Sequence, residues 1–128
     1  MFGLFNLFGR SAELKALDQA LREAGLHPQI VPEPVKLTTV RLLKAQPGAG
    51  SSLPQGAYDE AAQLLGYCML GRDQFIASTS MGEAERAKER LEIAISEGDS
   101  LDAQIILLAL HSGMIVAEVA DRFEVETE

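Results

Sequence analysis

The stretch LDAQIILLALHSGMIVAEVADRF, residues 101–123, contains the densest apolar run of the 128-residue chain. Its first half holds a series of aliphatic side chains: Ala103, Ile105, Ile106, Leu107, Leu108, Ala109 and Leu110. On an α-helix these positions cover nearly the whole circumference, and a helix that is apolar all round has to be enclosed by other elements. The stretch therefore predicts a buried helix near residues 101–112, around which the rest of the chain packs.

Helical signals recur along the remainder of the sequence. Ser11 is a good N-cap, Gly25 suits a left-handed C-cap before Leu26, and Ser80 and Glu83 have the spacing of a capping box. Apolar residues at helical spacing predict helices over 12–24, 34–45, 57–70 and 81–97, with a short helical turn over 72–79. Because no alternating strand pattern accompanies them, we predict an all-α fold, a compact orthogonal bundle of five or six helices.

Two helices have sequence features that suggest how they pack. Small residues at Ala61, Ala62 and Gly66 allow another backbone to approach closely, and we expect the segment 105–110 to do so. The charges of residues 83–92 alternate in sign, which is typical of a solvated helix face with salt bridges along it.

Length and composition place limits on the class of protein. One domain over residues 1–128 is expected, with an apolar N-terminal segment at 1–10 and a flexible connector rich in Gly and Ser at 46–55. The net charge of −8 argues against a nucleic-acid partner, which would require clustered Lys and Arg. The single cysteine, Cys68, predicts a reducing compartment, the cytoplasm. No apolar run is long enough to predict a membrane span.

The N-terminal segment MFGLFNLFG is unusually aromatic. Phe2, Phe5 and Phe8 are three of the five phenylalanines in the chain, and Leu4 and Leu7 lie between them. We expect this segment to pack on the body of the domain or across a dimer interface. The alternative is a foot that inserts into a membrane surface, although such a foot normally has a more basic polar face.

One arrangement near the end of the chain has the spacing of a helix-turn-helix. Ala109 is a small residue where a second helix can pack, Gly113 follows in the turn, and Val119 can close the pair. The second helix, expected from about residue 116 to 123, carries Glu118 and Asp121, and these acids would repel DNA phosphates. The spacing thus predicts a packed helix pair without strong DNA binding.

The sequence contains no catalytic, cofactor or metal motif. Its two histidines are His27, in a proline-rich connector, and His111, at the end of the apolar helix. Neither has a Glu-x-x-His, His-x-x-x-His or Cys-x-x-Cys partner, so no metal site is predicted. An enzyme or small-ligand site would require a pocket that joins His111 to Tyr67, Cys68 or Asp102. We interpret Cys68 instead as a buried, unreactive thiol and His111 as a residue of the helix end.

We therefore predict a small non-enzymatic helical domain that acts through contact with another protein or with a second copy of itself in a homodimer. Two alternatives remain open. The first is a helix-turn-helix-related regulator without strong DNA binding, and the second is a ligand or enzyme pocket around His111.

Overall fold

The computed structural model describes residues 11–47 and 53–121. Within these ranges helices joined by short loops make up the secondary structure and there is no β-strand, which confirms the predicted all-α class. The labelled elements are α2 (Ala12–Glu23), η1 (Pro28–Ile30), α3 (Glu33–Lys44), α4 (Gln55–Leu70), α5 (Arg72–Ser78), α6 (Met81–Glu97) and α7 (Leu101–Ser112), where η1 is a 3-10 helix. A further short helical segment covers residues 117–121.

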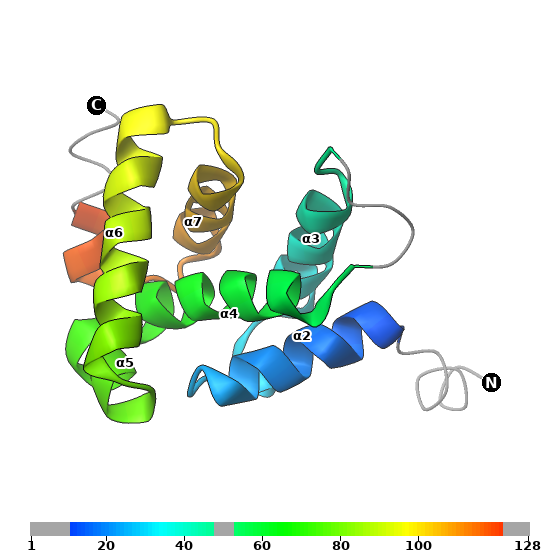
Figure 1. Cartoon of the computed structure of the whole chain (residues 1–128), viewed down its shortest axis with the longest axis horizontal. Coiled ribbons are helices and arrows are strands. Elements are labelled where there is room, and N and C mark those ends of the chain that lie inside the picture. The colour runs from blue at the N-terminus through cyan, green and yellow to red at the C-terminus, as the bar shows by residue number, and fades with distance from the viewer. Residues whose placement is uncertain (1–10, 48–52, 122–128) are drawn as a thin grey trace.

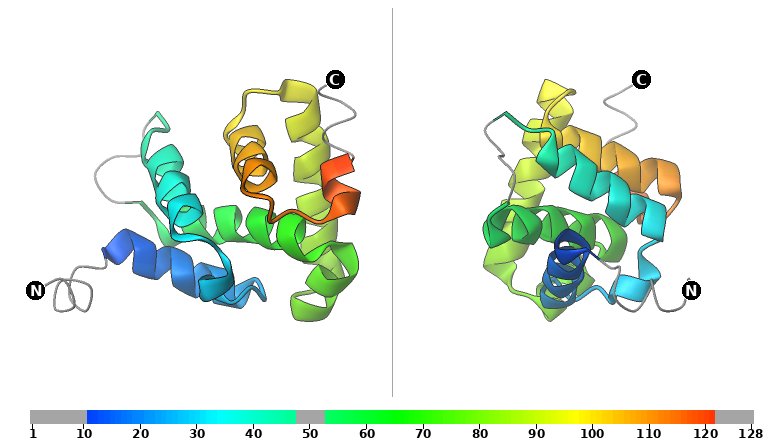
Figure 2. Two further views of the ribbon diagram at one scale, coloured as in Figure 1. Left: turned by 180° about the vertical axis from the view of Figure 1, so that it is seen from behind. Right: turned by 90° about the vertical axis from the view of Figure 1, so that its right-hand side faces the viewer.

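Helix α4 runs through the middle of the molecule (Figure 1). Helix α2 packs along one side of α4, while α3 and α7 lie side by side across the opposite side. Helix α6 crosses α4 near its end, where α5 also packs (Figures 1 and 2). Since α4 contacts α2, α5, α6 and α7, it is the helix that connects the two halves of the fold.

The predicted helix boundaries agree closely with the structure. Helix α2 begins at the Ser11 cap, whose hydroxyl accepts a hydrogen bond from the Leu14 N–H at 3.1 Å. It ends in a Schellman motif, because Gly25 has a φ of +87° and the Leu26 N–H bonds the Leu21 carbonyl at 2.9 Å. The side chain of Leu26 is buried, so this end of the helix is fixed by packing as well as by hydrogen bonds.

The core forms where α4 meets its neighbours. Eight residues of α4 are buried: Tyr58, Ala61, Ala62, Leu64, Leu65, Gly66, Tyr67 and Cys68. The prediction that segment 105–110 approaches Gly66 is wrong in detail, because a Cβ on Gly66 would lie 3.2 Å from the Phe75 ring and 3.3 Å from Ala24. The small residue therefore admits Ala24, at the end of α2, and the α5 aromatic, although α7 does pack on α4 as the sequence predicts. Phe75 is fully buried, and its ring meets the Tyr67 ring edge-on at a centroid distance of 5.8 Å.

Helix α7 lies where the apolar run predicts a core helix, but its neighbours do not enclose it completely. Ala103, Ile105, Ile106 and Ala109 are buried against α3, α4 and α6. Leu107 and Leu108 pack against the core as well, but they stay partly exposed. The physical reason is geometric: α3, α4 and α6 together do not surround the whole apolar circumference of α7.

The connector after α2 is more regular than its three prolines suggest, because residues 28–30 form the 3-10 helix η1. Helix α3 then starts at Glu33, one residue before the predicted first position. Of the predicted flexible connector at 46–55, residues 48–52 lie outside the described ranges, and Gln55 already belongs to α4.

Candidate functional site

The outer face of α7 is the most distinctive surface of the described residues. It consists of Gln104, Leu107, Leu108 and His111, which follow one another at the i, i+3, i+4 and i+7 positions that share one side of a helix. Gln104 and His111 are exposed, and the two leucines between them are partly exposed. The four residues form an apolar centre with one neutral polar side chain and one histidine at its ends, and we call them the α7 outer face.

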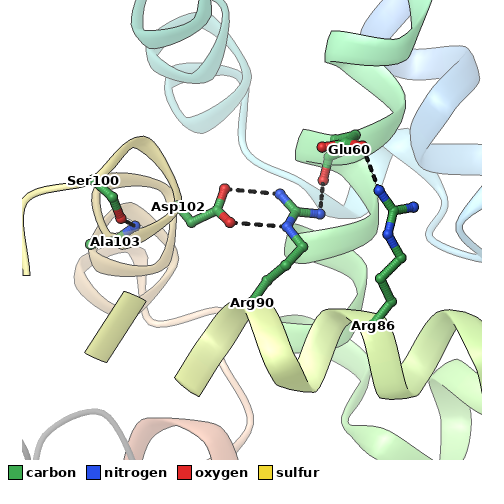
Figure 3. A network of polar contacts seen from close by, with 6 residues as sticks. All are labelled: Glu60, Arg86, Arg90, Ser100, Asp102 and Ala103. Atoms are coloured by element: carbon green, nitrogen blue, oxygen red, sulfur yellow. Dashed lines mark hydrogen bonds and ion pairs between the residues drawn. The ribbon is translucent and has the colours of Figure 1, made fainter. Parts of the chain in front are cut away.

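The start of α7 is fixed by its own cap and by a neighbouring arginine. The Ser100 hydroxyl accepts a hydrogen bond from the Ala103 N–H at 3.1 Å. Arg90 of α6 reaches across to Asp102 with two parallel bonds, Nε to Oδ2 and Nη2 to Oδ1, each 2.9 Å long (Figure 3). This paired geometry is a strong form of the arginine–carboxylate interaction, because both donors and both acceptors are aligned.

Arg90 also connects α7 to the central helix. Its remaining terminal nitrogen, Nη1, donates to the backbone carbonyl of Glu60 in α4 at 2.9 Å (Figure 3). One guanidinium therefore bonds α4, α6 and α7 together. Its partner Asp102 is the one carboxylate on α7, and its charge is compensated by Arg90. Asp102 does not belong to the α7 outer face, which therefore has no acidic side chain, although the whole chain has a net charge of −8.

The charged face of α6 is more than a solvated surface. The sequence predicts ion pairs along the helix, but the arginines bind other elements: Arg86 contacts the Glu60 carboxylate at 2.7 Å and Arg90 contacts Asp102. Arg72 of α5 pairs with Glu85 at 2.9 Å. The sequence could not predict these contacts. It indicates on which side of α6 an arginine lies, but it does not indicate which other helix packs against that side.

The turn after α7 has the predicted helix-turn-helix form. Gly113 adopts a φ of +79°, and the Val116 N–H then bonds the Cys68 carbonyl at 2.9 Å. Val119 is buried, as the motif requires, and the segment 117–121 packs at the end of α4. The Glu118 carboxylate lies so close to Gly71 that a Cβ there would be 2.8 Å from Oε1.

The residues of the predicted pocket lie in different environments. Cys68 and Tyr67 are buried in α4, whereas His111 is exposed on the last turn of α7. Burial raises the pKa of Cys68 to about 12, so its thiol is protonated at neutral pH. Burial also raises the pKa of Tyr67, and the Glu118 carboxylate adds to that shift. A pocket that joins His111 to Tyr67 or Cys68 remains a hypothesis.

The remaining residues that the sequence analysis considered as candidate site residues do not form a site within the described part of the chain. His27 precedes η1, where its Nδ1 accepts a hydrogen bond from the Gln29 N–H at 3.2 Å, so the ring caps a turn. Phe2, Phe5 and Phe8 lie outside the described residues. Within the described part of the chain, no three His, Cys, Asp or Glu side chains gather in a way that could hold a metal ion.

A cleft of about 430 Å³ lies between α2, η1 and the start of α3. Lys36 belongs to its lining, and the side chain of this lysine is only 5% exposed. Its Nζ lies 3.2 Å from Asp18 Oδ1, 3.2 Å from the Pro28 carbonyl and 3.3 Å from Glu33 Oε1. An ammonium has three N–H donors, and three oxygens already surround this one. Lys36 therefore fixes the connector to α2 and α3 rather than offering a free charge to a ligand.

Comparison of the chain with protein-family models, with curated proteins and with solved structures finds no match. Over residues 11–47 and 53–121, no helix is both long enough and apolar enough to cross a membrane. The function therefore has to be argued from the geometry described above.

Proposed function

We propose that this domain is non-enzymatic and acts by binding protein through the α7 outer face. The observation that supports this proposal is the incomplete enclosure of α7, whose leucines Leu107 and Leu108 pack against the core and still stay partly exposed. These two leucines lie next to each other at the centre of the α7 outer face, between the exposed Gln104 and His111. Contiguous apolar surface of this kind marks interaction sites more often than isolated exposed residues do.

Charge supports the same surface. A protein interface is depleted of charged residues at its centre, and the α7 outer face contains no carboxylate, lysine or arginine. Four large apolar residues are more exposed than Leu107 and Leu108, and they do not adjoin one another in sequence: Ile30 in η1, Leu37 in α3, and Met81 and Ile93, which lie twelve residues apart on α6. Each of these is accompanied by polar neighbours in sequence, so none of them forms an equivalent stripe along a helix.

The test compares two glutamate substitutions in the full chain. Leu108→Glu places a charge at the centre of the proposed face, and Ile93→Glu makes the same change at an exposed site on α6. Tagged chains are used to capture proteins from the native cell extract, after circular dichroism has shown that all three are equally helical. We expect wild type and Ile93→Glu to retain a stoichiometric protein, a second copy included, that Leu108→Glu loses. Identical capture by all three chains would overturn the proposal.

The aromatic N-terminal segment is a second proposed contact surface, supported by its sequence alone. Phe2, Phe5 and Phe8 supply large apolar area, which is what protein and dimer interfaces use. Serine at all three positions, in the full chain, should lower the apparent size in gel filtration or reduce partner capture. Unchanged size and unchanged capture would remove this segment from the interaction surface. A cytoplasmic location, supported by the single unpaired cysteine, belongs to the same proposal.

A helix-turn-helix-related regulator is the alternative function, and the turn at Gly113 with buried Val119 supports it. Its partner would be protein, because Glu118 and Asp121 on the second helix disfavour contact with DNA phosphates. A mobility-shift titration at low salt should show no saturable DNA complex. Tight, saturable binding in that assay would instead favour a DNA-binding regulator.

A further inference from the structure

We infer that residues 114–121 form a strap that opens and closes about Gly113 while helices α2 to α7 stay folded. In the closed state, which the structure shows, the strap covers the end of α4. It includes the short helical segment 117–121 and none of the residues of the α7 outer face. The inference therefore goes beyond the proposed function and does not rest on it.

Few contacts hold the strap in place. Within the described residues, two hydrogen bonds join it to the helices. The Val116 N–H donates to the Cys68 carbonyl at 2.9 Å, and the Met114 N–H donates to the Ser112 hydroxyl at 3.2 Å. Val119 is only 2% exposed, while every other residue of the strap is partly or fully exposed. A segment with so few buried apolar contacts lies at the low end of local stability.

The helices beside the strap have contacts of their own. Each of α2, α3, α4, α6 and α7 contains at least four buried residues. The last turn of α7 is closed by the Ser112 hydroxyl, which donates to the Ala109 carbonyl at 2.7 Å. The junction of α4 and α5 is closed by the Gly71 N–H, which donates to the Tyr67 carbonyl at 2.9 Å. These two hydrogen bonds involve no residue of the strap, so they persist when it opens.

Gly113 has the properties of a hinge. It ends α7 with a φ of +79°, and a Cβ placed on it would have no atom within 4 Å. A glycine with free space around it can leave the left-handed region at little cost, and hinges are residues at the ends of elements that absorb such a change. The strap then moves as one unit, because the Val119 and Ala120 N–H groups both bond the Val116 carbonyl, at 3.1 and 3.0 Å.

Opening exposes a defined part of α4. The Cys68 carbonyl loses its donor and becomes available to water, and the apolar surface on which Val119 packs is uncovered. The Cys68 thiol stays covered. Burial raises its pKa, and Arg90 and Asp102 are the charged groups that influence this pKa, so the thiol lies toward α6 and the start of α7. The strap is thus a reversible cover for the end of α4.

The first experiment is amide hydrogen exchange on the full chain, measured by NMR and corrected for intrinsic rates. The Val116 amide reports opening of the strap, and the amides of the buried residues Leu64 and Ile106 report global unfolding. We expect Val116 to exchange at least about tenfold faster than the other two, with an opening free energy that falls much less with urea than theirs. Exchange of all three amides with one opening free energy overturns the inference.

A pair of glycine substitutions tests the hinge. Gly113 and Gly98 have φ values of +79° and +78°, and a Cβ on either would meet open space. Alanine at either position should therefore raise the exchange of the Leu64 and Ile106 amides by about 5- to 30-fold, the factor expected for a left-handed alanine. Only Gly113→Ala should raise Val116 exchange as well, because opening relieves the strain at that residue alone. Equal Val116 exchange in the two variants overturns the inference.

A pair of valine substitutions tests the anchor. Val119 and Val31 are each 2% exposed, and circular dichroism shows whether both alanine variants remain folded. Only Val119→Ala should raise Val116 exchange, by about tenfold or more, because Val31 lies between η1 and α3 and stays packed when the strap opens. If Val31→Ala raises Val116 exchange as much as Val119→Ala does, the strap opens only with the whole chain, and the inference is wrong.

Discussion

Arg90 and Asp102 are joined by two parallel hydrogen bonds of 2.9 Å, and the same guanidinium bonds the Glu60 carbonyl in a third helix. Arg90 is only 15% exposed and Asp102 is 27% exposed, so solvent screens the pair less than it screens a surface ion pair. Arg86, one turn earlier on α6, makes a single contact to Glu60 and is 54% exposed. The two arginines therefore offer a matched comparison.

Arg90→Lys should destabilise the fold by about 1–3 kcal/mol, because a lysine cannot make the paired contact to Asp102 and also reach the Glu60 carbonyl. Arg86→Lys should change the free energy of unfolding by less than about 0.5 kcal/mol, as is usual for an exposed pair. Urea unfolding followed by circular dichroism measures both. Equal effects of the two substitutions would show that the three-helix contact of Arg90 adds no stability.

Gly25→Ala should be among the most destabilising single changes at a glycine. The residue has a φ of +87°, and an added Cβ would lie 2.2 Å from the Ser78 Cβ. Gly98 has a similar φ of +78° but open space around it. Gly98→Ala should therefore lower the free energy of unfolding only by the cost of a left-handed backbone conformation for alanine, about 1–2 kcal/mol.

The excess for Gly25→Ala over Gly98→Ala measures the contact with α5 and can be read from thermal unfolding. Adding Ser78→Gly to the Gly25→Ala chain should recover most of the excess. No recovery would mean that the cost arises from the backbone alone.

The Cys68 thiol should be unreactive in the folded chain. Burial raises its pKa to about 12, so a disulfide reagent at pH 8 should modify it only as fast as the chain unfolds, and rapidly in urea. Fast stoichiometric labelling of the folded chain would contradict the burial of this helix face.

The same pKa shift has a consequence for stability at high pH. The pKa of a cysteine thiol in an unfolded chain is about 8.5, whereas burial raises the pKa of Cys68 in the folded chain to about 12. The unfolded state therefore releases its proton first, and the contribution of Cys68 to stability is complete below about pH 8.5 and declines as the pH rises from there toward 12. Cys68→Ala should reduce the slope of stability against pH in this window. An unchanged slope would assign the alkaline loss to other groups.

Substitutions along α7 should separate stability from association. Ile106 is fully buried, so Ile106→Ala should cost about 2–5 kcal/mol in unfolding free energy. Leu108 is partly exposed, and Leu108→Ala should cost roughly half as much while still weakening the proposed protein binding. Denaturant unfolding measures the first effect and partner capture measures the second. A larger unfolding cost for Leu108→Ala than for Ile106→Ala would mean that this leucine serves the core.

Local signals account for most of what the sequence predicts correctly. Ser11 and Ser80 cap the helices that follow them, and Gly25 and Gly113 end helices with positive φ. These features depend on side chains within a few residues of each other, so they can be predicted from the local sequence alone. The burial of Val119 could be predicted for a similar reason, because the spacing from Ala109 through Gly113 to Val119 is that of one short helix pair.

Contacts between distant segments were the part that the sequence did not reveal. The small residue Gly66 indicates that something approaches α4 closely, but nothing local says that it is Ala24 and Phe75. Lys36 looks like an ordinary helical lysine until Asp18 and the Pro28 carbonyl are found beside it. The α7 outer face could not be predicted for the same reason, since a helix that is apolar all round does not indicate which of its residues stay partly exposed.

The hydrogen bond from the Val116 N–H to the Cys68 carbonyl has a consequence for the order of folding. Cys68 lies in the last turn of α4, where carbonyls have no partner within the helix. Its acceptor is satisfied only by a residue far downstream, so a long loop must close before the end of α4 is complete. Helices α2 and α6 contain their own caps and can form from local contacts, whereas this junction has to wait for the segment beyond Gly113. The arrival of that segment is therefore expected as a late step in folding, and it covers the end of the central helix.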